Sequence, residues 1–275
     1  MVVYFYQIDK VFKIRRALSQ QFCDESNWKQ AATVLVYILP SFESGFSSIS
    51  HLVKLETYLL IAKLWFQGND VDEAEKYVNK AQLIISDKTP LNIQCQFKKQ
   101  NAYLSELKRK FIDASRKYLD FANLISKNPE LNDNSAFNLG EALTKAINCA
   151  ILADAGQARS IILAILYKDE RTNLLPVFGI LESVYLDRMV NKEQRIHFSS
   201  TLEAHQNAVL ANNETICDRA FVQHNILAAS RFYNNIALEE LGNMLFISTE
   251  KTEYIAAQMI SEVIKTPYSV YYCLQ

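Results

Sequence analysis

Val71-Asp72-Glu73-Ala74-Glu75-Lys76-Tyr77-Val78 is the stretch that decides the predicted fold. It places the large residue Val71 three positions before the small residue Ala74, and the large residue Val78 four positions after it. Residues spaced three and four apart lie on one face of an α-helix, and the small residue lets a neighbouring helix approach closely. We therefore predict an amphipathic helix that begins at Val71 and packs against another helix through Ala74.

The same pattern occurs at two other places in the chain, and its three copies start 43 and then 40 residues apart. The copies are Trp28/Ala31/Leu35, Val71/Ala74/Val78 and Phe111/Ala114/Tyr118. A helical unit that recurs with such a period is typical of a solenoid of the tetratricopeptide type. The alternative is a helical domain without repeats, because a single small residue anchors the register of each unit.

Each of these helices has a predicted partner helix, in residues 53–66, 93–107 and 141–155. Their apolar faces are Leu55, Leu59, Ala62 and Trp65 or Phe66; Phe97, Ala102, Tyr103 and Leu107; and Leu143, Ile147, Ala150 and Ile151. Tight polar turns end them, Gly68-Asn69-Asp70 after the first and Gly156-Gln157 after the third. The long polar stretches 40–50 and 126–138 fall between the predicted hairpins, and residues 174–189 and 212–233 are further predicted helices.

The composition supports a large helical core and excludes several classes of protein. The 275 residues are 49% hydrophobic and include only 6 Gly and 5 Pro. The best apolar runs, 34–39 and 161–167, are too short to cross a bilayer, which takes roughly 20 residues, and are predicted to be buried helix faces. A net charge of −1 gives no reason to expect binding to nucleic acid or to a membrane. The five cysteines have no metal-ligand spacing, and most are predicted core residues.

Residues 238–262 are predicted to form a helix-turn-helix. Leu238 opens a short helix that closes near Leu245, and Ser248-Thr249-Glu250 offers an N-cap for a second helix. The second helix continues through Thr252, Ile255, Ala256, Met259 and Ile260. The acidic residues of the whole segment 238–262 are Glu239, Glu240, Glu250, Glu253 and Glu262, and its one basic residue is Lys251. Because DNA binding depends on contacts between cations and phosphates, this surface predicts docking of proteins instead.

No pattern of a catalytic or cofactor site occurs in the sequence. There is no glycine-rich phosphate loop, no Gly-x-Ser-x-Gly elbow and no Cys-x-x-Cys. The histidines, His51, His197, His205 and His224, form no pair with metal-ligand spacing. We therefore predict a non-catalytic protein with no metal and no cofactor.

One segment is strongly basic. It contains Lys98, Lys99, Lys108, Arg109, Lys110, Arg116 and Lys117, against Glu106 and Asp113. A solvated face of a helical repeat would explain this excess, and so would an acidic protein partner.

Several segments, in this order and spacing, resemble the PCI family, which is shared by the proteasome lid, a translation initiation factor and the signalosome. The segments include Asn27-Trp28-Lys29-Gln30-Ala31-Ala32, Tyr185-Leu186-Asp187-Arg188, His224-Asn225, Glu239-Glu240-Leu241-Gly242 and Gln258-Met259-Ile260. They are most similar to the signalosome branch. The resemblance implies a scaffold in the cytoplasm and nucleus that docks other signalosome subunits and cullin-RING ubiquitin ligases, and so supports removal of a ubiquitin-like modifier from cullins by a different subunit. The alternative is a PCI subunit of the proteasome lid or of a translation initiation factor complex.

The expected fold is all-α: a TPR-like helical-hairpin solenoid in residues 1–190, followed in 191–275 by the C-terminal part of a PCI domain with a truncated winged helix. The family has further repeats before this segment and a β-hairpin wing and a long helix after it, for which residues 263–275 leave no room. The residues predicted to meet partners are Glu239, Glu240, Glu250, Lys251, Lys108, Arg109 and Lys110.

Overall fold

The computed structural model describes residues 2–40, 50–131, 137–209 and 214–265. Apart from one isolated antiparallel bridge between Val209 and Thr215, every regular element in these ranges is helical. The chain divides into two compact units, residues 1–142 and 143–275. The all-α fold class is therefore confirmed.

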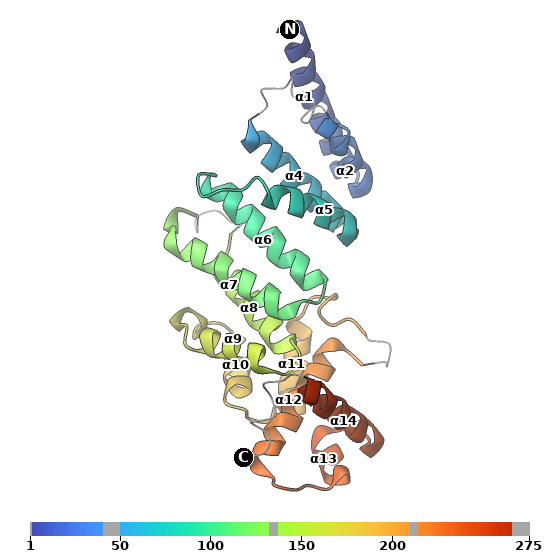
Figure 1. Ribbon diagram of the computed structural model, residues 1–275, viewed down its shortest axis with the longest axis vertical. Coiled ribbons are helices and arrows are strands. Elements are labelled where there is room, and N and C mark those ends of the chain that lie inside the picture. The colour runs from blue at the N-terminus through green and yellow to red at the C-terminus, as the bar shows by residue number, and fades with distance from the viewer. Residues whose placement is uncertain (1, 41–49, 132–136, 210–213, 266–275) are drawn as a thin grey trace. The chain divides into compact units, whose positions relative to one another are not determined.

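The first unit consists of helical hairpins that lie one after another, coloured from blue to green in Figure 1. Within a hairpin, α1 packs on α2, α4 on α5 and α6 on α7; between hairpins, α2 packs on α4, and α6 on both α4 and α5. The elements that lie in this unit are α1 (Val2–Asp24), α2 (Trp28–Val36), α4 (His51–Gln67), α5 (Val71–Gln82), α6 (Leu91–Leu107), α7 (Phe111–Lys127) and η1 (Pro129–Leu131).

The three hairpins share one kind of turn. Ser26, Asn69 and Arg109 adopt a left-handed backbone, with φ of 58°, 56° and 58°. In each turn, the N–H of this residue donates to the carbonyl three residues back, and the next N–H donates to the carbonyl five residues back. This pattern satisfies carbonyls at the end of the first helix and reverses the chain into the second. The recurrence at matching positions explains why the sequence period is close to 40 residues.

The small residues of the repeat lie where helices approach closely. Ala31, Ala74 and Ala114 are fully buried, and so are Leu35 and Val78. The side-chain amide of Gln100 on α6 donates to the carbonyl of Leu59 on α4 at 3.0 Å, so that neighbouring hairpins are also joined by a hydrogen bond. The helices predicted in 53–66 and 93–107, and those that begin at Val71 and Phe111, therefore lie in hairpins as expected.

The second unit is built around α12. This helix packs against α11, α13 and α14, while α9 packs on α10. The helices are α8 (Leu139–Leu152), which begins at the end of the first unit, then α9 (Gln157–Tyr167), η2 (Glu170–Thr172), α10 (Phe178–Tyr185), α11 (Lys192–Thr201), α12 (Ile216–Phe232), α13 (Leu238–Leu245) and α14 (Thr249–Lys265). No helix in the described ranges has both the length and the apolar composition needed to span a membrane.

Two polar residues of α12 hold the segment between α10 and α11. The amide of Asn225 accepts from the N–H of Val190 and donates to its carbonyl, both at 2.9 Å. Next to it, the imidazole Nε2 of His224 lies 2.9 Å from the carbonyl of Arg188. Because a carbonyl only accepts, Nε2 carries the proton here. The pair His224-Asn225 therefore stabilises the connection between two helices.

Some sequence predictions differ from the structure. The sequence pattern predicted no helix before Trp28, where α1 lies. The helix predicted in 174–189 covers only Phe178–Tyr185, because turns occupy the residues before it and Asp187 is left-handed. On α9, Ile161 and Ile165 are 51% and 47% exposed, so the run 161–167 is not a wholly buried face. Most of the predicted polar stretch 40–50, most of the chain from 263 onward, and Cys273 lie outside the described residues.

Candidate functional site

The helix-turn-helix that the sequence predicts is formed by α13 and α14. Leu241, Leu245, Ile255 and Met259 are all buried, in one core cluster with Val222 and Ala229 of α12. Gly242 permits the close approach of the two helices: a Cβ at this position would lie 3.1 Å from both the carbonyl oxygen of Ile247 and the hydroxyl of Thr252. The buried face of the pair is thus fixed, and its other face is exposed.

That outer face carries the predicted acidic docking residues, which we call the acidic surface: Glu239, Glu240 and Glu250. All three are exposed, the first two in the opening turn of α13 and the third in the opening turn of α14. Acidic side chains are favoured at the N-terminus of a helix by the helix dipole, so these glutamates also stabilise α13 and α14.

Lys251 is held within the fold. Its ammonium forms an ion pair with the carboxylate of Glu214, whose side chain is 5% exposed. The cation therefore compensates a buried negative charge in the same unit. Its contact with a partner stays a prediction, and the acidic surface keeps its negative sign.

Lys108, Arg109 and Lys110, which we call the basic turn, form the connection between α6 and α7. Arg109 and Lys110 are exposed, whereas Lys108 forms an ion pair with Glu75 of α5. Two of the three cations therefore point into solvent at one end of the hairpin.

The basic turn departs from the other two turns at the start of the following helix. Asn27 and Asp70 are the N-caps of α2 and α5, and their side chains accept the N–H of Gln30 and Glu73. Lys110 is the N-cap of α7 and has no side-chain capping bond. A cation at this position also opposes the helix dipole. Local stability thus does not explain why a lysine occupies it.

The remaining basic residues of the segment do not join the basic turn. Lys99 lies 3.7 Å from a carboxylate oxygen of Glu141, and Lys117 donates to Asn101 Oδ1 and Ser105 Oγ, both at 2.7 Å. Burial lowers the pKa of Lys117, since it disfavours the charged form. The sequence alone could not divide the segment in this way, because the partners of these lysines lie up to 42 residues away from them.

The thiols of the described cysteines are poor candidates for chemistry. Cys95, Cys149 and Cys217 are buried, as predicted for most of them. Burial raises the pKa of Cys95 to about 11 and that of Cys217 to about 12. Since the thiolate is the reactive form, both side chains act as small apolar residues at neutral pH.

Comparison with known proteins agrees with the two-unit organisation. The family model described as "PSMD12/CSN4, N-terminal" matches residues 9–128, and the model of the PCI domain matches residues 194–263. The first lies within the first unit and the second within the second unit.

Whole-chain relatives carry one name in several organisms. COP9 signalosome complex subunit 4 of Drosophila melanogaster is 39% identical over 92% of this chain, and that of Arabidopsis thaliana is 36% identical over 92%. The subunit of Dictyostelium discoideum is also 36% identical over 92% of the chain. The chain spans 60%, 64% and 62% of the length of these three relatives. The chain thus carries a segment that matches the PCI domain, and over 92% of its length it is similar to COP9 signalosome complex subunit 4 of these organisms.

Proposed function

We propose that this chain is a non-catalytic scaffold subunit of the COP9 signalosome. In this role it docks other signalosome subunits and cullin-RING ubiquitin ligases, and it supports removal of the ubiquitin-like modifier from cullins without carrying out the cleavage. Such a complex would act in the cytoplasm and nucleus. The observation that carries the proposal is the α13–α14 pair, whose apolar side chains are buried against α12 while its exposed charged residues form one acidic surface.

The charge of this surface favours protein partners over DNA. Glu253 is also exposed on α14, and the ammonium of Lys251 is neutralised by Glu214. A duplex would thus meet four exposed carboxylates of Glu239, Glu240, Glu250 and Glu253 with no uncompensated cation among the residues 238–251, which is the wrong sign for phosphate contacts.

Affinity capture of the tagged full chain from cells, with identification of the proteins that co-purify, tests the proposal. We expect signalosome subunits in amounts comparable with the chain itself. The N-terminal family model is shared with PSMD12. Recovery of proteasome-lid or initiation-factor subunits in place of signalosome subunits would assign the chain to a different complex and overturn the proposal.

Reversal of charge at the basic turn tests its part in docking. Arg109→Glu with Lys110→Glu should weaken capture of the ligase or of a neighbouring subunit, and more so at low salt, because exposed charges are screened as salt rises. Lys108 is left unchanged, since it ion-pairs with Glu75. Lys88→Glu with Lys127→Glu is the matched control, because both lysines are exposed and have no ion pair among the described residues. Equal losses in the two double variants would favour a solvated repeat face.

A further inference from the structure

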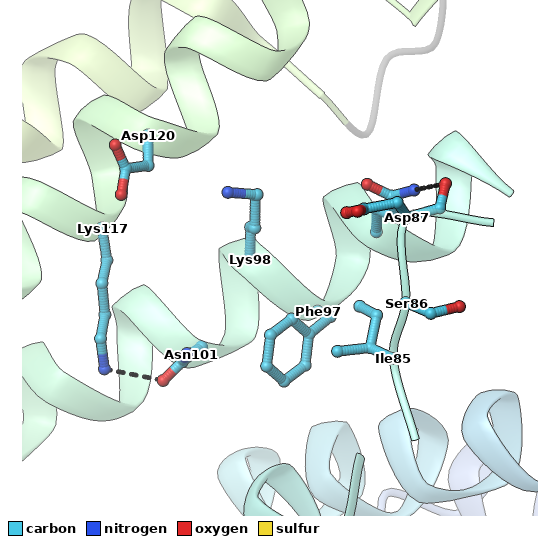
Figure 2. A pocket seen from close by; sticks show the side chains of 9 residues that line it. Ile85, Ser86, Asp87, Phe97, Lys98, Asn101, Lys117 and Asp120 are labelled. Carbon is cyan, nitrogen blue, oxygen red and sulfur yellow. Dashed lines mark hydrogen bonds between the residues drawn. The ribbon is translucent and has the colours of Figure 1, made fainter. Parts of the chain in front are cut away.

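A small pocket lies in the first unit, and none of its lining residues belongs to the basic turn. Its walls come from the loop after α5, from α6 and from α7, and its volume is about 250 Å³. The lining residues are Ile85, Ser86, Asp87, Gln94, Phe97, Lys98, Asn101, Lys117 and Asp120. Figure 2 shows Lys98 extending from α6 in the space between Asp120 and Asp87, above Phe97.

The loop that closes one side of the pocket is held by hydrogen bonds. The amide of Gln94 donates to the carbonyls of Asp87 and Thr89, at 3.3 and 2.7 Å. The N–H of Ser86 donates to the hydroxyl of Thr89 at 3.1 Å, and the N–H of Thr89 donates back to the carbonyl of Ser86 at 3.0 Å. The pocket is therefore formed in the chain before any ligand arrives, which lowers the entropic cost of binding.

The size of the pocket limits what can enter it. Pockets for drug-sized molecules usually measure about 300–1,000 Å³. A volume of about 250 Å³ is smaller, and suits one side chain presented by a protein. The floor is apolar, because Phe97 is only 8% exposed and Ile85 is half-buried, so it fits the methylene groups of a side chain.

The basic side chains of the pocket are more buried than its acidic ones. Lys98 and Lys117 are half-buried, whereas Asp87 and Asp120 are exposed at the rim. Lys98 has no hydrogen bond and no ion pair among the described residues, whereas Lys117 donates to two neutral oxygens and also interacts electrostatically with Asp113. A carboxylate that enters the pocket would meet the ammonium of Lys98, since that of Lys117 is turned toward Asn101 (Figure 2). The two aspartates outside would repel a polyanion and attract a neighbouring cation.

We propose that this pocket binds a glutamate side chain of a partner protein, flanked in that partner by basic residues. The carboxylate lies at the ammonium of Lys98, its methylene groups lie on Phe97, and the flanking cations lie by Asp87 and Asp120. The inference does not depend on the proposed function, since it applies to any protein partner, and its test uses the chain without other subunits.

The test is titration of the isotope-labelled full chain, followed by NMR, with the blocked peptide acetyl-Lys-Glu-Lys-amide. We expect saturable shifts at the backbone amides of Lys98, Asn101 and Lys117. The glutamine peptide acetyl-Lys-Gln-Lys-amide should bind about tenfold more weakly, since it lacks the charge. Equal binding of the two peptides, or absence of shifts with both, would overturn the proposal.

Lys98→Met keeps the length and apolar stem of the side chain and removes its charge. It should abolish the preference for glutamate, while Lys127→Met, an exposed change on the same hairpin outside the pocket, should preserve it. A Lys98→Met variant that retains the preference would overturn the proposal. Inorganic phosphate at the same concentration is the remaining arm: shifts at the same amides larger than those given by the glutamate peptide would show an oxyanion site without carboxylate preference, and would also overturn it.

Discussion

Lys110 stands where the equivalent turns carry a capping residue, and this contrast can be measured directly. We expect Lys110→Asp to supply the missing cap of α7 and to raise the free energy of unfolding by about 1 kcal/mol, or the Tm by roughly 2–4 °C. The reverse change Asp70→Lys should lower stability by a similar amount, because Asp70 accepts the N–H of Glu73 at 3.2 Å. Thermal melts of the two variants that move in the same direction would contradict the equivalence of the turns.

His224 should make the second unit sensitive to acid. Burial lowers the pKa of its imidazole, with Arg159 and Arg231 adding to this and with Asp187 and the carbonyl of Arg188 opposing it. The unfolded chain therefore takes up this proton at a higher pH than the folded chain, near 6.5. The contribution of neutral His224 to the free energy of unfolding is therefore fully present above about pH 6.5. It is lost as the pH falls towards the pKa of His224 in the folded chain.

Unfolding by urea between pH 7 and pH 5 measures this effect. His224→Gln removes the titrating group and keeps an amide that can donate to Arg188, so its loss of stability over this range should be smaller than that of the parent. His197→Gln is the control, because His197 is exposed. If both variants follow the parent, protonation of His224 does not cause the acid sensitivity.

Substitution of two glycines by alanine separates the effect of close helix packing on stability from the effect of helix propensity. Gly242→Ala would place a Cβ 3.1 Å from a backbone oxygen in the turn between α13 and α14, whereas Gly179 on α10 has nothing within 4 Å of such a Cβ. We expect Gly242→Ala to destabilise by about 1–3 kcal/mol through overpacking. Gly179→Ala should stabilise by up to about 1 kcal/mol. Stabilisation by both substitutions in chemical unfolding would show that α13 and α14 are not tightly packed.

The alanines of the repeat give the corresponding test in the first unit. Ala74→Leu and Ala114→Leu should each lower the free energy of unfolding by about 1–3 kcal/mol, because both side chains are fully buried between helices. Ala257→Leu on the exposed side of α14 should be close to neutral. Melts of the buried variants that match the parent would refute the hairpin register.

The elements that could be predicted from the sequence are those whose buried face is apolar. Ala31, Ala74 and Ala114 recur at one spacing, and Leu241 to Met259 follow a helical period. The helix α1 could not be found in this way, because Ser19 takes a buried position on it and donates to the carbonyl of Ala31 at 3.0 Å. The pocket around Lys98 could not be predicted from the sequence either, because its lining residues, between 85 and 120, come together only when the hairpins pack.

At the scale of the whole molecule, the acidic surface and the basic turn lie in different units. A chain that docks through both should lose complex formation in two independent steps. Charge reversal at Glu239, Glu240 and Glu250 should weaken one set of contacts, and reversal at Arg109 and Lys110 the other. In capture experiments at a fixed salt concentration, the variant with both sets reversed should lose more binding than either single set, because sites that share no partner act additively. If the combined variant binds no more weakly than the variants with a single set reversed, the two surfaces contribute to the same contact with a partner.

The central claim is that the chain contributes contacts and no catalysis. Native mass spectrometry of the purified chain mixed with the purified remaining signalosome subunits, combined with an assay for removal of the modifier from cullin, tests this most directly. We expect one copy of the chain in the complex, and cleavage by the complex but not by the chain alone. A chain that stays outside the complex, or that cleaves modified cullin without the other subunits, would contradict it.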